Sequence, residues 1–340
     1  MGSLISIIIP CRNEEKFIAK CLDSVLEFEC DREFEVLIVD GMSDDATRDI
    51  VKEYQNRFPQ IRLLENRQKT VPYAMNIGIK EAKGDIIVRL DAHAKFPIDY
   101  LKQLLFWKEK LNADNVGGIV KTLPPNNTAK AKAIALALSS PFGVGNSYFR
   151  VGAKEPMRVD TVPFGCYNKD TLLKLGLYDT DLTRNQDDEL NARLIQNGKK
   201  IWLIPNIVID YYARSSFKAL FKMFYQYGYF KPLVNKKLKH PATVRQFVPL
   251  IFVLFIFIGL ISIFFSKIAL KLYLAGLSFY FALSAFFGFK LAKKEKNLKL
   301  VLYLLFGFFI IHFAYGLGYL KGILDFIVLN KAKKDISLSR

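Results

Sequence analysis

Three long apolar runs near the carboxyl end constrain the fold more than any other feature of this sequence. They cover residues 247–265, 269–289 and 300–320. A helix that crosses a membrane needs about 20 predominantly apolar residues, and each run approaches or reaches that length. The sequence therefore predicts a membrane-embedded helical region at 246–329 instead of an entirely soluble protein.

The residues before these runs have the composition of a water-soluble domain. Short β-branched runs alternate with amphipathic helical patterns, and the strands are expected at 4–9, 35–39, 61–64 and 86–90. Regular alternation of strand and helix predicts a doubly wound α/β domain with a mostly parallel sheet. We place this domain at 1–212. Amphipathic interfacial helices and a basic linker are expected at 213–245, and a basic tail at 330–340.

The positive charge of the chain bears on its partners. A formal net charge of +17 would suit a nucleic-acid binder, but many lysines and arginines flank the apolar runs, at 231–245 and 290–299. Anionic lipid headgroups are the expected partners at such places, so we predict membrane lipids and no nucleic acid.

The loop at 290–299 is the most basic and should face the cytoplasm. This predicts a multi-pass protein of the cell (inner or plasma) membrane, with its α/β domain in the cytoplasm.

The end of the chain leaves the number of crossings open. Three crossings would place Lys331, Lys333 and Lys334 on the outer side, against the tendency of basic residues to stay inside. Either residues 318–329 lie in the membrane interface, or the last segment is re-entrant.

Several polar side chains stand where the predicted strands of the α/β domain finish. Asp40 comes after the second strand, Asp91 after the fourth, and residues 10–13 after the first. Ligands of doubly wound sheets bind beyond the carboxyl ends of the strands, so this edge is the candidate site. The sequence has neither the glycine pattern of a nicotinamide fold nor that of a P-loop, and a diphosphate would need another means of attachment.

Asp91 and His93 directly follow the strand predicted at 86–90. Residues two apart in extended chain project to the same side, which brings a carboxylate and an imidazole together. This pattern is a half-site for a divalent cation whose open positions phosphate oxygens would fill. The competing interpretation is that Asp91 caps the loop and His93 lies on the surface.

A second acidic cluster surrounds Asp187. Leu190 and Leu194 share one face of a predicted helix, and Asp187 stands in the loop or first turn, where the helix dipole favours a carboxylate. An ordinary acidic helix start is the alternative interpretation.

Four short motifs resemble, in their order, those of the family 2 glycosyltransferases, which have the GT-A fold. They lie at 9–14, 39–44, 74–78 and 89–94, within a similarity that extends from residue 4 to about 230. More narrowly, the motifs resemble the membrane-bound bacterial branch typified by a succinoglycan glucosyltransferase. The resemblance implies a Rossmann-like GT-A catalytic domain with a mostly parallel sheet, followed by an α-helical transmembrane region.

The resemblance also implies roles for single residues. Asp187 matches the catalytic base, and Asp91 matches a ligand of Mn²⁺ or Mg²⁺. His93 replaces the second Asp of the usual Asp-x-Asp and is implied as the second metal ligand, and Gln186 stands where Glu is usual. The residues implied in nucleotide-sugar binding are Pro10, Arg12, Asn13, Glu14, Asp40, Asn76, Arg89 and Asp91. Those implied in the acceptor region are Gly165, Gln186, Asp188 and Arg214.

These matches imply an inverting, metal-dependent glycosyltransferase. It would move a sugar from a nucleotide-sugar, with UDP the expected nucleotide, to a hydroxyl of a lipid-linked or growing saccharide in the synthesis of a cell-surface polysaccharide or glycan. A polyprenyl-phosphate sugar transferase is the alternative, and its ionised acceptor would need no base. A non-catalytic membrane scaffold with a nucleotide-sugar fold is an alternative of another class.

Overall fold

The computed structural model describes residues 4–262 and 264–331, and the contacts within the chain divide it into two units. Unit 1 comprises residues 1–121 and 152–211, and unit 2 comprises residues 122–151 and 212–340. The basic tail predicted at 330–340 lies outside the described residues from position 332 onward.

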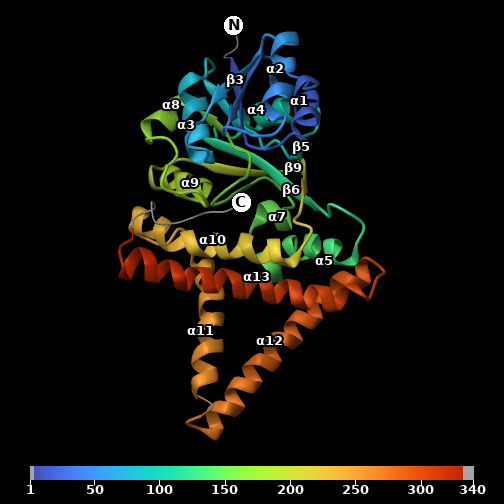
Figure 1. The fold of residues 1–340 in the computed structure, drawn as a ribbon, viewed down its shortest axis with the longest axis vertical. Helices are drawn as coiled ribbons and strands as arrows, with labels where there is room; N and C mark the ends of the chain where they lie inside the picture. Colours follow the sequence, from blue (N-terminus) through green and yellow to red (C-terminus); the bar gives the residue numbers. More distant parts are fainter. Residues whose placement is uncertain (1–3, 263, 332–340) are drawn as a thin grey trace. The chain divides into compact units, whose positions relative to one another are not determined.

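Unit 1 is built on a sheet that has the predicted α/β order (Figure 1). The strand order is β3-β2-β1-β4-β8-β6-β9-β5, and β7 pairs with β9. The strands are β1 Ile5–Cys11, β2 Phe34–Asp40, β3 Ile61–Glu65, β4 Ile86–Arg89, β5 Ala94–Lys95, β6 Asn115–Leu123, β7 Met157–Arg158, β8 Cys166–Asn168 and β9 Ile201–Tyr212. The helices are α1 Ile18–Leu26, α2 Thr47–Arg57, α3 Val71–Glu81, α4 Tyr100–Lys110, α8 Lys169–Lys174 and α9 Gln186–Gln196.

The first four strands are parallel, as predicted. Ile5 of β1 is in register with Phe34 of β2 and with Ile86 of β4. Nearly every residue of β1 and β2 is buried, including neighbours that point to opposite faces, because helices cover both sides of the sheet. Beyond β4 the sheet is no longer parallel, because β8 runs antiparallel to both of its neighbours, β4 and β6. This edge brings Gly165, next to β8, beside the end of β4.

Unit 2 consists of helices. They are α5 Ala129–Leu138, α6 Pro141–Val144, α7 Tyr148–Val151, α10 Phe217–Leu238, a 3₁₀ turn Val244–Gln246, α11 Phe247–Ser262, α12 Lys267–Lys294 and α13 Leu300–Gly322, which continues as a π-helix over Ile323–Val328. Three of the described helical segments are long and apolar enough to cross a membrane, namely Val244–Ser262, Lys267–Lys294 and Leu300–Val328. A carboxyl-terminal region of membrane-type helices, as predicted, is therefore confirmed.

Residues 122–151 group with unit 2, although the sequence analysis includes them in the domain 1–212. Their largest helix, α5, buries Ile134 and Leu138 in one apolar cluster with Leu304 and Phe308 of α13. Helix α5 is apolar on most of its surface, so it is stable only where other apolar helices cover it.

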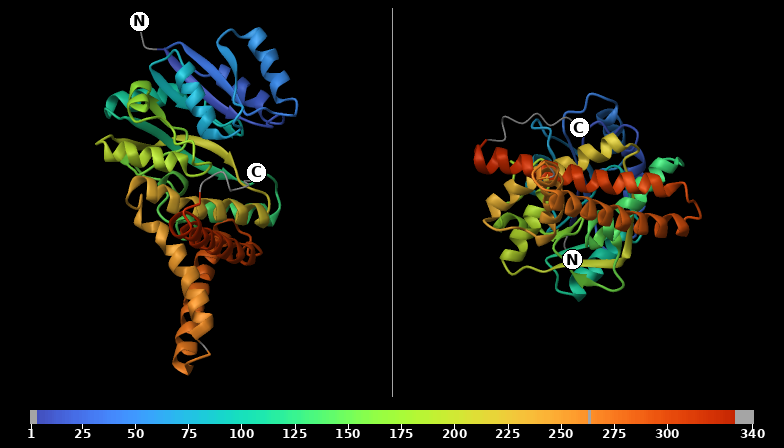
Figure 2. Two further views of the ribbon diagram at one scale, coloured as in Figure 1. Left: turned by 60° about the vertical axis from the view of Figure 1, so that its left-hand side comes forward. Right: turned by 90° about the horizontal axis from the view of Figure 1, so that it is seen from below.

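Helices α10 and α13 pack side by side, as Figures 1 and 2 show. Glycines make this contact close. A Cβ added at Gly228 would lie 2.0 Å from the carbonyl oxygen of Tyr315, and one at Gly318 would lie 2.1 Å from that of Tyr225. Backbones can approach this closely only where side chains are absent, as between many membrane helices.

We expect Gly228→Ala to lower the stability of unit 2 by about 1–3 kcal/mol, because the new methyl group must push α10 and α13 apart. The matched control is Gly307→Ala in α13, where the nearest atoms to an added Cβ lie 3.7 Å away. That variant should be neutral or slightly stabilising, since alanine favours a helix over glycine. Thermal unfolding in detergent measures both. Equal melting temperatures for the two variants would contradict the close α10–α13 contact.

Candidate active site

The candidate site of unit 1 is organised by Arg89, the last residue of β4. Its guanidinium donates to Oδ1 of Asp91 from Nε at 3.3 Å and from Nη2 at 3.1 Å. Its third nitrogen, Nη1, donates to Oδ1 of Asp187 in the first turn of α9. One side chain thus brings together two carboxylates that the sequence analysis singles out separately.

Burial makes this arrangement electrostatically strong. Arg89 is 7% exposed, whereas the side chains of Asp91 and Asp187 are 22% and 33% exposed. A guanidinium does not lose its proton in a protein, so the buried cation needs anionic partners. Burial raises the pKa of Asp187, Arg89 opposes this effect, and the charges of Asp91 and Asp188 raise the pKa further.

The start of α9 is held so that Asp187 faces Arg89. Asn185 precedes the helix in the left-handed conformation, at φ 59°. Glu189 is buried and binds Arg193 one turn later, with bonds of 2.6 Å and 2.8 Å. Arg193 also donates to the carbonyl oxygens of Leu175 and Leu177, which fixes the helix to the preceding segment. Glu189 therefore has a structural role, and Asp187 is the acid of this turn that reaches Arg89.

Two loops of the same sheet edge lie against each other. The backbone N–H of Asn13 donates to Oγ of Ser43 at 2.9 Å, and that of Glu14 donates to Oγ1 of Thr47 at 2.8 Å. Asp40 is fully buried, and its carboxylate accepts bonds from the backbone and the hydroxyl of Ser43. The predicted gathering of these residues at one edge is confirmed. Asp40 closes its own loop and does not cap α2, which starts after Ala46.

Asp91 and His93 have different neighbours. Asp91 binds Arg89, while Nδ1 of His93 lies 3.7 Å from Oε1 of Glu14 and its ring lies 5.9 Å from that of Tyr211. Among the described residues, no group of three or more His, Cys, Asp or Glu side chains could hold a metal ion. Both Arg89 bonds to Asp91 use Oδ1, so Oδ2 is the oxygen suited to a cation. This set fits Mn²⁺ or Mg²⁺ only if phosphate and water supply most of the ligands.

Asn76 has an architectural role in this structure. Its side-chain amide donates to the carbonyl oxygen of Tyr178 at 2.8 Å and accepts from the N–H of the same residue at 2.9 Å. These bonds tie α3 to the segment before α9. A contact between Asn76 and a nucleotide stays a prediction.

The predicted acceptor residues have different environments. Gly165 accepts a bond from the backbone N–H of Arg89 at 3.1 Å, and a Cβ there would lie 2.5 Å from the Tyr167 ring. Gln186 is buried beside Asp187, and its Oε1 has no hydrogen-bond partner among the described residues. Asp188 lies in the first turn of α9. Arg214 belongs to unit 2 and is exposed, so contacts within unit 1 do not bring it to this site.

Pro10 and Arg12 also lie at this sheet edge. Pro10 pairs with Val39 of β2, and the side chain of Arg12 packs where a Cβ of Gly41 would lie. Tyr178 is a further residue of this site that no sequence pattern predicts. It is buried, and its pKa is raised by burial and by Asp187 and lowered by Arg89. A single aromatic residue in a loop has no periodic pattern that would reveal it.

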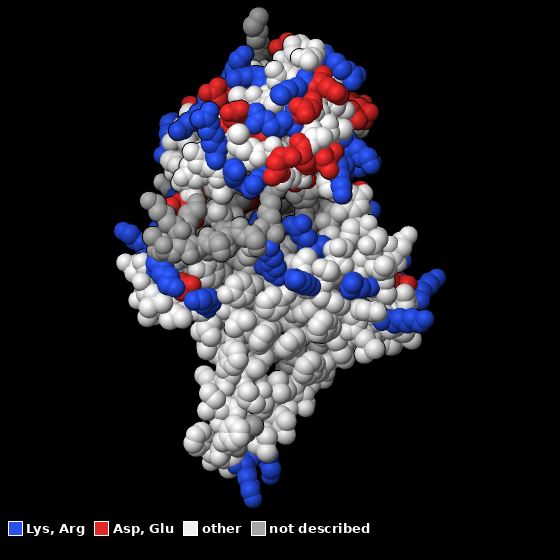
Figure 3. Space-filling model, in the orientation of Figure 1, with Lys and Arg blue, Asp and Glu red and all other residues white. Residues whose placement is uncertain are grey.

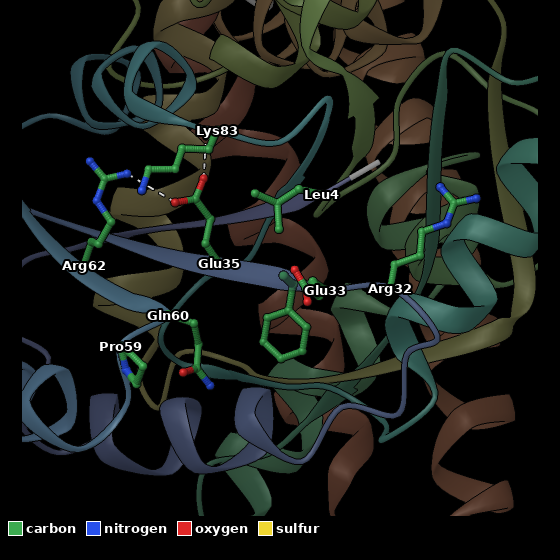
Figure 4. Close-up of a pocket in the computed structure, with 9 residues that line it drawn as sticks. Leu4, Arg32, Glu33, Glu35, Pro59, Gln60, Arg62 and Lys83 are labelled. Atoms are coloured by element: carbon green, nitrogen blue, oxygen red, sulfur yellow. Dashed lines mark hydrogen bonds and ion pairs between the residues drawn. The ribbon is translucent and has the colours of Figure 1, made fainter. Parts of the chain in front are cut away.

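A pocket of about 450 Å³ lies elsewhere, at the opposite edge of the sheet (Figure 4). It is lined by Leu4, Arg32, Glu33, Phe34, Glu35, Pro59, Gln60, Arg62 and Lys83. Figure 4 shows two donors to the Glu35 carboxylate. The backbone N–H of Lys83 donates to Oε1 at 2.6 Å, and Nη1 of Arg62 donates to Oε2 at 3.2 Å. The Glu35 carboxylate of this pocket is therefore already paired. The pocket also lies at the amino ends of parallel strands, whereas such sheets bind their ligands at the carboxyl ends.

Comparison with known proteins gives a family and a fold. A model of glycosyl transferase family 2 matches residues 6–166. A relative from Methanococcus voltae is 39% identical over 245 residues, which cover 69% of this chain and 75% of the relative. It is a dolichyl N-acetyl-alpha-D-glucosaminyl phosphate 3-beta-D-2,3-diacetamido-2,3-dideoxy-beta-D-glucuronosyltransferase.

The succinoglycan biosynthesis protein ExoA of Rhizobium meliloti (strain 1021) is 30% identical over 248 residues, covering 72% of this chain and 74% of ExoA. Among solved structures, the mannosyltransferase PcManGT from Pyrobaculum calidifontis, in complex with GDP-Man and Mn²⁺, has a TM-score of 0.58 at 18% identity. That match covers 90% of this chain and 86% of PcManGT. The GT-A fold and the resemblance given by the four motifs are confirmed.

We expect Arg89→Met to destabilise unit 1 by about 2–3 kcal/mol at pH 7. This is less than the cost of breaking a fully buried ion pair, because Asp91 and Asp187 are partly exposed. A carboxyl whose pKa is higher in the folded protein stabilises it below the unfolded-state pKa, and this stability is lost as the pH rises through the folded-state pKa. Without Arg89 the pKa of Asp187 should rise further. The variant should therefore lose more stability than the wild type between acidic and neutral pH.

The matched control for this prediction is Arg62→Met. Arg62 also bridges two acids, Glu35 and Glu81, but it is 29% exposed and lies at the other edge of the sheet. Its loss should cost about 1 kcal/mol, because Ser6 and the backbone N–H of Lys83 also donate to the Glu35 carboxylate and Glu81 is exposed. Thermal unfolding between pH 4 and 8 measures both variants. Equal losses, or a loss for Arg89→Met that does not change with pH, would contradict the electrostatic role of Arg89.

Proposed function

The chain belongs to the family 2 glycosyltransferases, and from this premise we propose that it is an inverting enzyme that depends on a divalent metal. It would move a sugar from a nucleotide-sugar, with UDP as the expected nucleotide, to a hydroxyl of a lipid-linked or growing saccharide. The observation that carries this proposal is the contact of Arg89 with both Asp91 and Asp187. The carboxylate expected near the diphosphate and the one expected near the acceptor share one guanidinium.

Asp187 is proposed as the general base. It would accept the proton of the acceptor hydroxyl as that oxygen attacks the anomeric carbon from the face opposite the nucleotide. A pKa raised by burial suits this task, because a base works best when its pKa is nearer to the working pH. One displacement inverts the anomeric centre and requires no covalent intermediate. Arg89 would hold Asp187 in place, and the Glu189–Arg193 pair would hold the helix turn that positions it.

Asp91, with His93 in support, would hold the divalent cation. When bound, Mn²⁺ or Mg²⁺ would offset the charge of the diphosphate leaving group. Pro10, Arg12, Asn13, Glu14, Asp40, Asn76 and Arg89 remain the proposed neighbours of the nucleotide-sugar. Gly165, Gln186, Asp188 and Arg214 remain the proposed acceptor residues. The unpartnered Oε1 of buried Gln186 supports a polar ligand next to Asp187.

The nature of the acceptor is inferred from the relatives and from unit 2. The Methanococcus voltae relative is named for transfer to a sugar carried on dolichyl phosphate, and ExoA for succinoglycan biosynthesis. Helices apolar enough to cross a membrane would keep the enzyme where lipid-linked saccharides occur. We propose a multi-pass protein of the cell membrane whose domain 1–212 is cytoplasmic, with an interfacial region at 213–245 and a membrane region at 246–329.

Asp187→Asn should reduce transfer to a hydroxyl acceptor by about 10²–10⁴-fold, because no group would then remove the hydroxyl proton. The measurement is a donor screen with purified protein in detergent, followed by mass spectrometry of the lipid product. Asp170→Asn is the control, since Asp170 also lies in the first turn of a helix but is exposed. A mild effect of Asp187→Asn with polyprenyl phosphate as the productive acceptor would support the alternative transferase. Full activity of Asp187→Asn on saccharides would contradict the proposed base.

Calorimetry with UDP-sugars should detect binding that is about tenfold tighter with Mn²⁺ than with a chelator, or ~1.4 kcal/mol. Asp91→Ala should remove this metal dependence. The control is Asp85→Ala, because Asp85 is exposed just before the opposite end of the same strand. Binding of GDP-sugars alone would contradict the UDP donor. An absence of heat for the wild type and both variants would favour the non-catalytic scaffold.

A further inference from the structure

The three candidate spans of unit 2 are not equivalent. In the most apolar 18-residue stretch of the segments that contain α11 and α12, only 11% is buried inside the described structure. In the segment that contains α13 the buried share is 44%. Residues of α11 and α12 such as Ile251, Ile258 and Phe279 are more than 60% exposed. Apolar surface left open on this scale needs lipid around it. Helix α13 has protein around much of its surface, so apolarity alone does not require that it cross the bilayer.

Helix α13 packs lengthwise along α10 and runs transverse to α11. Its apolar face joins Leu220 and Phe224 of α10 in the cluster that also holds Leu304 and Phe308. Gly322 extends the close α10–α13 contact, since a Cβ there would lie 2.2 Å from the carbonyl oxygen of Tyr229. Helix α11 meets α13 near its own start, where Pro249 lies against Gly316, and then leads away (Figure 1). Figure 2 shows the same relation from two other sides.

Helix α10 has the composition of a helix that lies on a membrane. Lysines recur along it between aromatic residues, and its last turn contains Lys236 and Lys237. The aromatic rings of Tyr225 and Tyr229 stack at 6.2 Å on one side of the helix. Tyrosine and lysine are enriched at membrane–water interfaces, whereas the core of a bilayer disfavours so many ammonium groups. A helix packed along α10 must lie at nearly the same depth.

Charge in unit 2 is strongly asymmetric. The residues of unit 2 include 23 of the 49 lysines and arginines but only three of the 32 acids. At the turn between α11 and α12 the chain has Lys267 and Lys271, and the other basic residues lie outside that hairpin or near its open end. Figure 3 shows basic side chains at the lower tip, an uncharged surface above it, and a second basic zone beyond. Two basic zones separated by an apolar one match the two faces of a bilayer.

We propose that only α11 and α12 cross the bilayer, as a helical hairpin, and that α10 and α13 lie together in the plane of one membrane face. The 19 residues of Val244–Ser262 span about 28 Å at 1.5 Å per residue, close to the ~30 Å of the hydrocarbon core. Phe264 and Phe265, which are 81% and 83% exposed, and the two tip lysines then reach the far interface. Chain segments on both sides of the hairpin stay on the face that carries most of the positive charge.

This topology rests on the membrane location proposed above, but it is independent of the reaction. It differs from three crossings in one testable respect, the side on which the chain leaves α13. With two crossings Lys331 lies on the same side as Lys294, and the conflict with the positive-inside tendency disappears. Lys331 also pairs with Asp325 at 3.0 Å, next to the α10 residue Tyr229, which binds the same carboxylate at 2.9 Å. The end of the described chain is thus held at α10.

Single cysteines placed in the full chain and labelled in sealed vesicles with a membrane-impermeant maleimide test this topology. The parent is Cys30→Ser, because Cys11, Cys21 and Cys166 are buried. Lys239→Cys, Lys294→Cys and Leu329→Cys should all be labelled from one side, and Phe265→Cys only from the other side. These four positions are exposed in the described structure.

Labelling of Leu329→Cys from the side opposite to Lys294→Cys would overturn the proposal in favour of three crossings. Labelling of Phe265→Cys from the same side as Lys294→Cys would overturn it as well, since the hairpin would not cross. The same set in an Asp187→Asn background should give an unchanged pattern. Loss of transfer with the pattern intact would concern the reaction alone, and a changed pattern in active protein would concern the topology alone.

Discussion

The buried guanidinium of Arg89 is the interaction on which the site depends. A cation that is 7% exposed needs neutralisation, and two acids from distant parts of the chain provide it. Strand β4 fixes Arg89 and Asp91, while the Asn76–Tyr178 bonds and the Glu189–Arg193 pair fix the turn that carries Asp187. The sheet therefore supplies one half of the site and α9 the other, and electrostatics joins them.

The two units follow different physical rules. In unit 1, strands buried on both faces hold polar loops at one edge, where water and a charged ligand can meet. In unit 2, glycines let α10 and α13 approach closely, and apart from Lys267 and Lys271 the basic residues lie outside the α11–α12 hairpin or near its open end. A family 2 glycosyltransferase thus combines a sheet that positions polar loops with a separate helical unit whose helices are apolar enough to cross a membrane.

Much of this organisation could be predicted from the sequence, because it depends on local patterns. The β-branched run at 86–90 and the observed β4, Ile86–Arg89, agree closely, and the motif at 89–94 and the acidic cluster at 187–189 single out Asp91 and Asp187. The Arg89 bridge could not be predicted, since nothing local indicates which acids a buried arginine meets. The grouping of residues 122–151 with unit 2 could not be predicted for a related reason. Apolarity and length indicate that a helix is buried but not whether lipid or protein covers it.

The central claim is that Asp91 and Asp187 form one electrostatic unit through Arg89. A double-mutant cycle on the free energy of unfolding, with Asp91→Asn, Asp187→Asn and the double variant at pH 7, tests it most directly. We predict a coupling energy of about 1 kcal/mol or more, because either substitution changes what the other costs. Additivity within ~0.3–0.5 kcal/mol would contradict the claim, since it would mean that the two carboxylates do not act on the same cation.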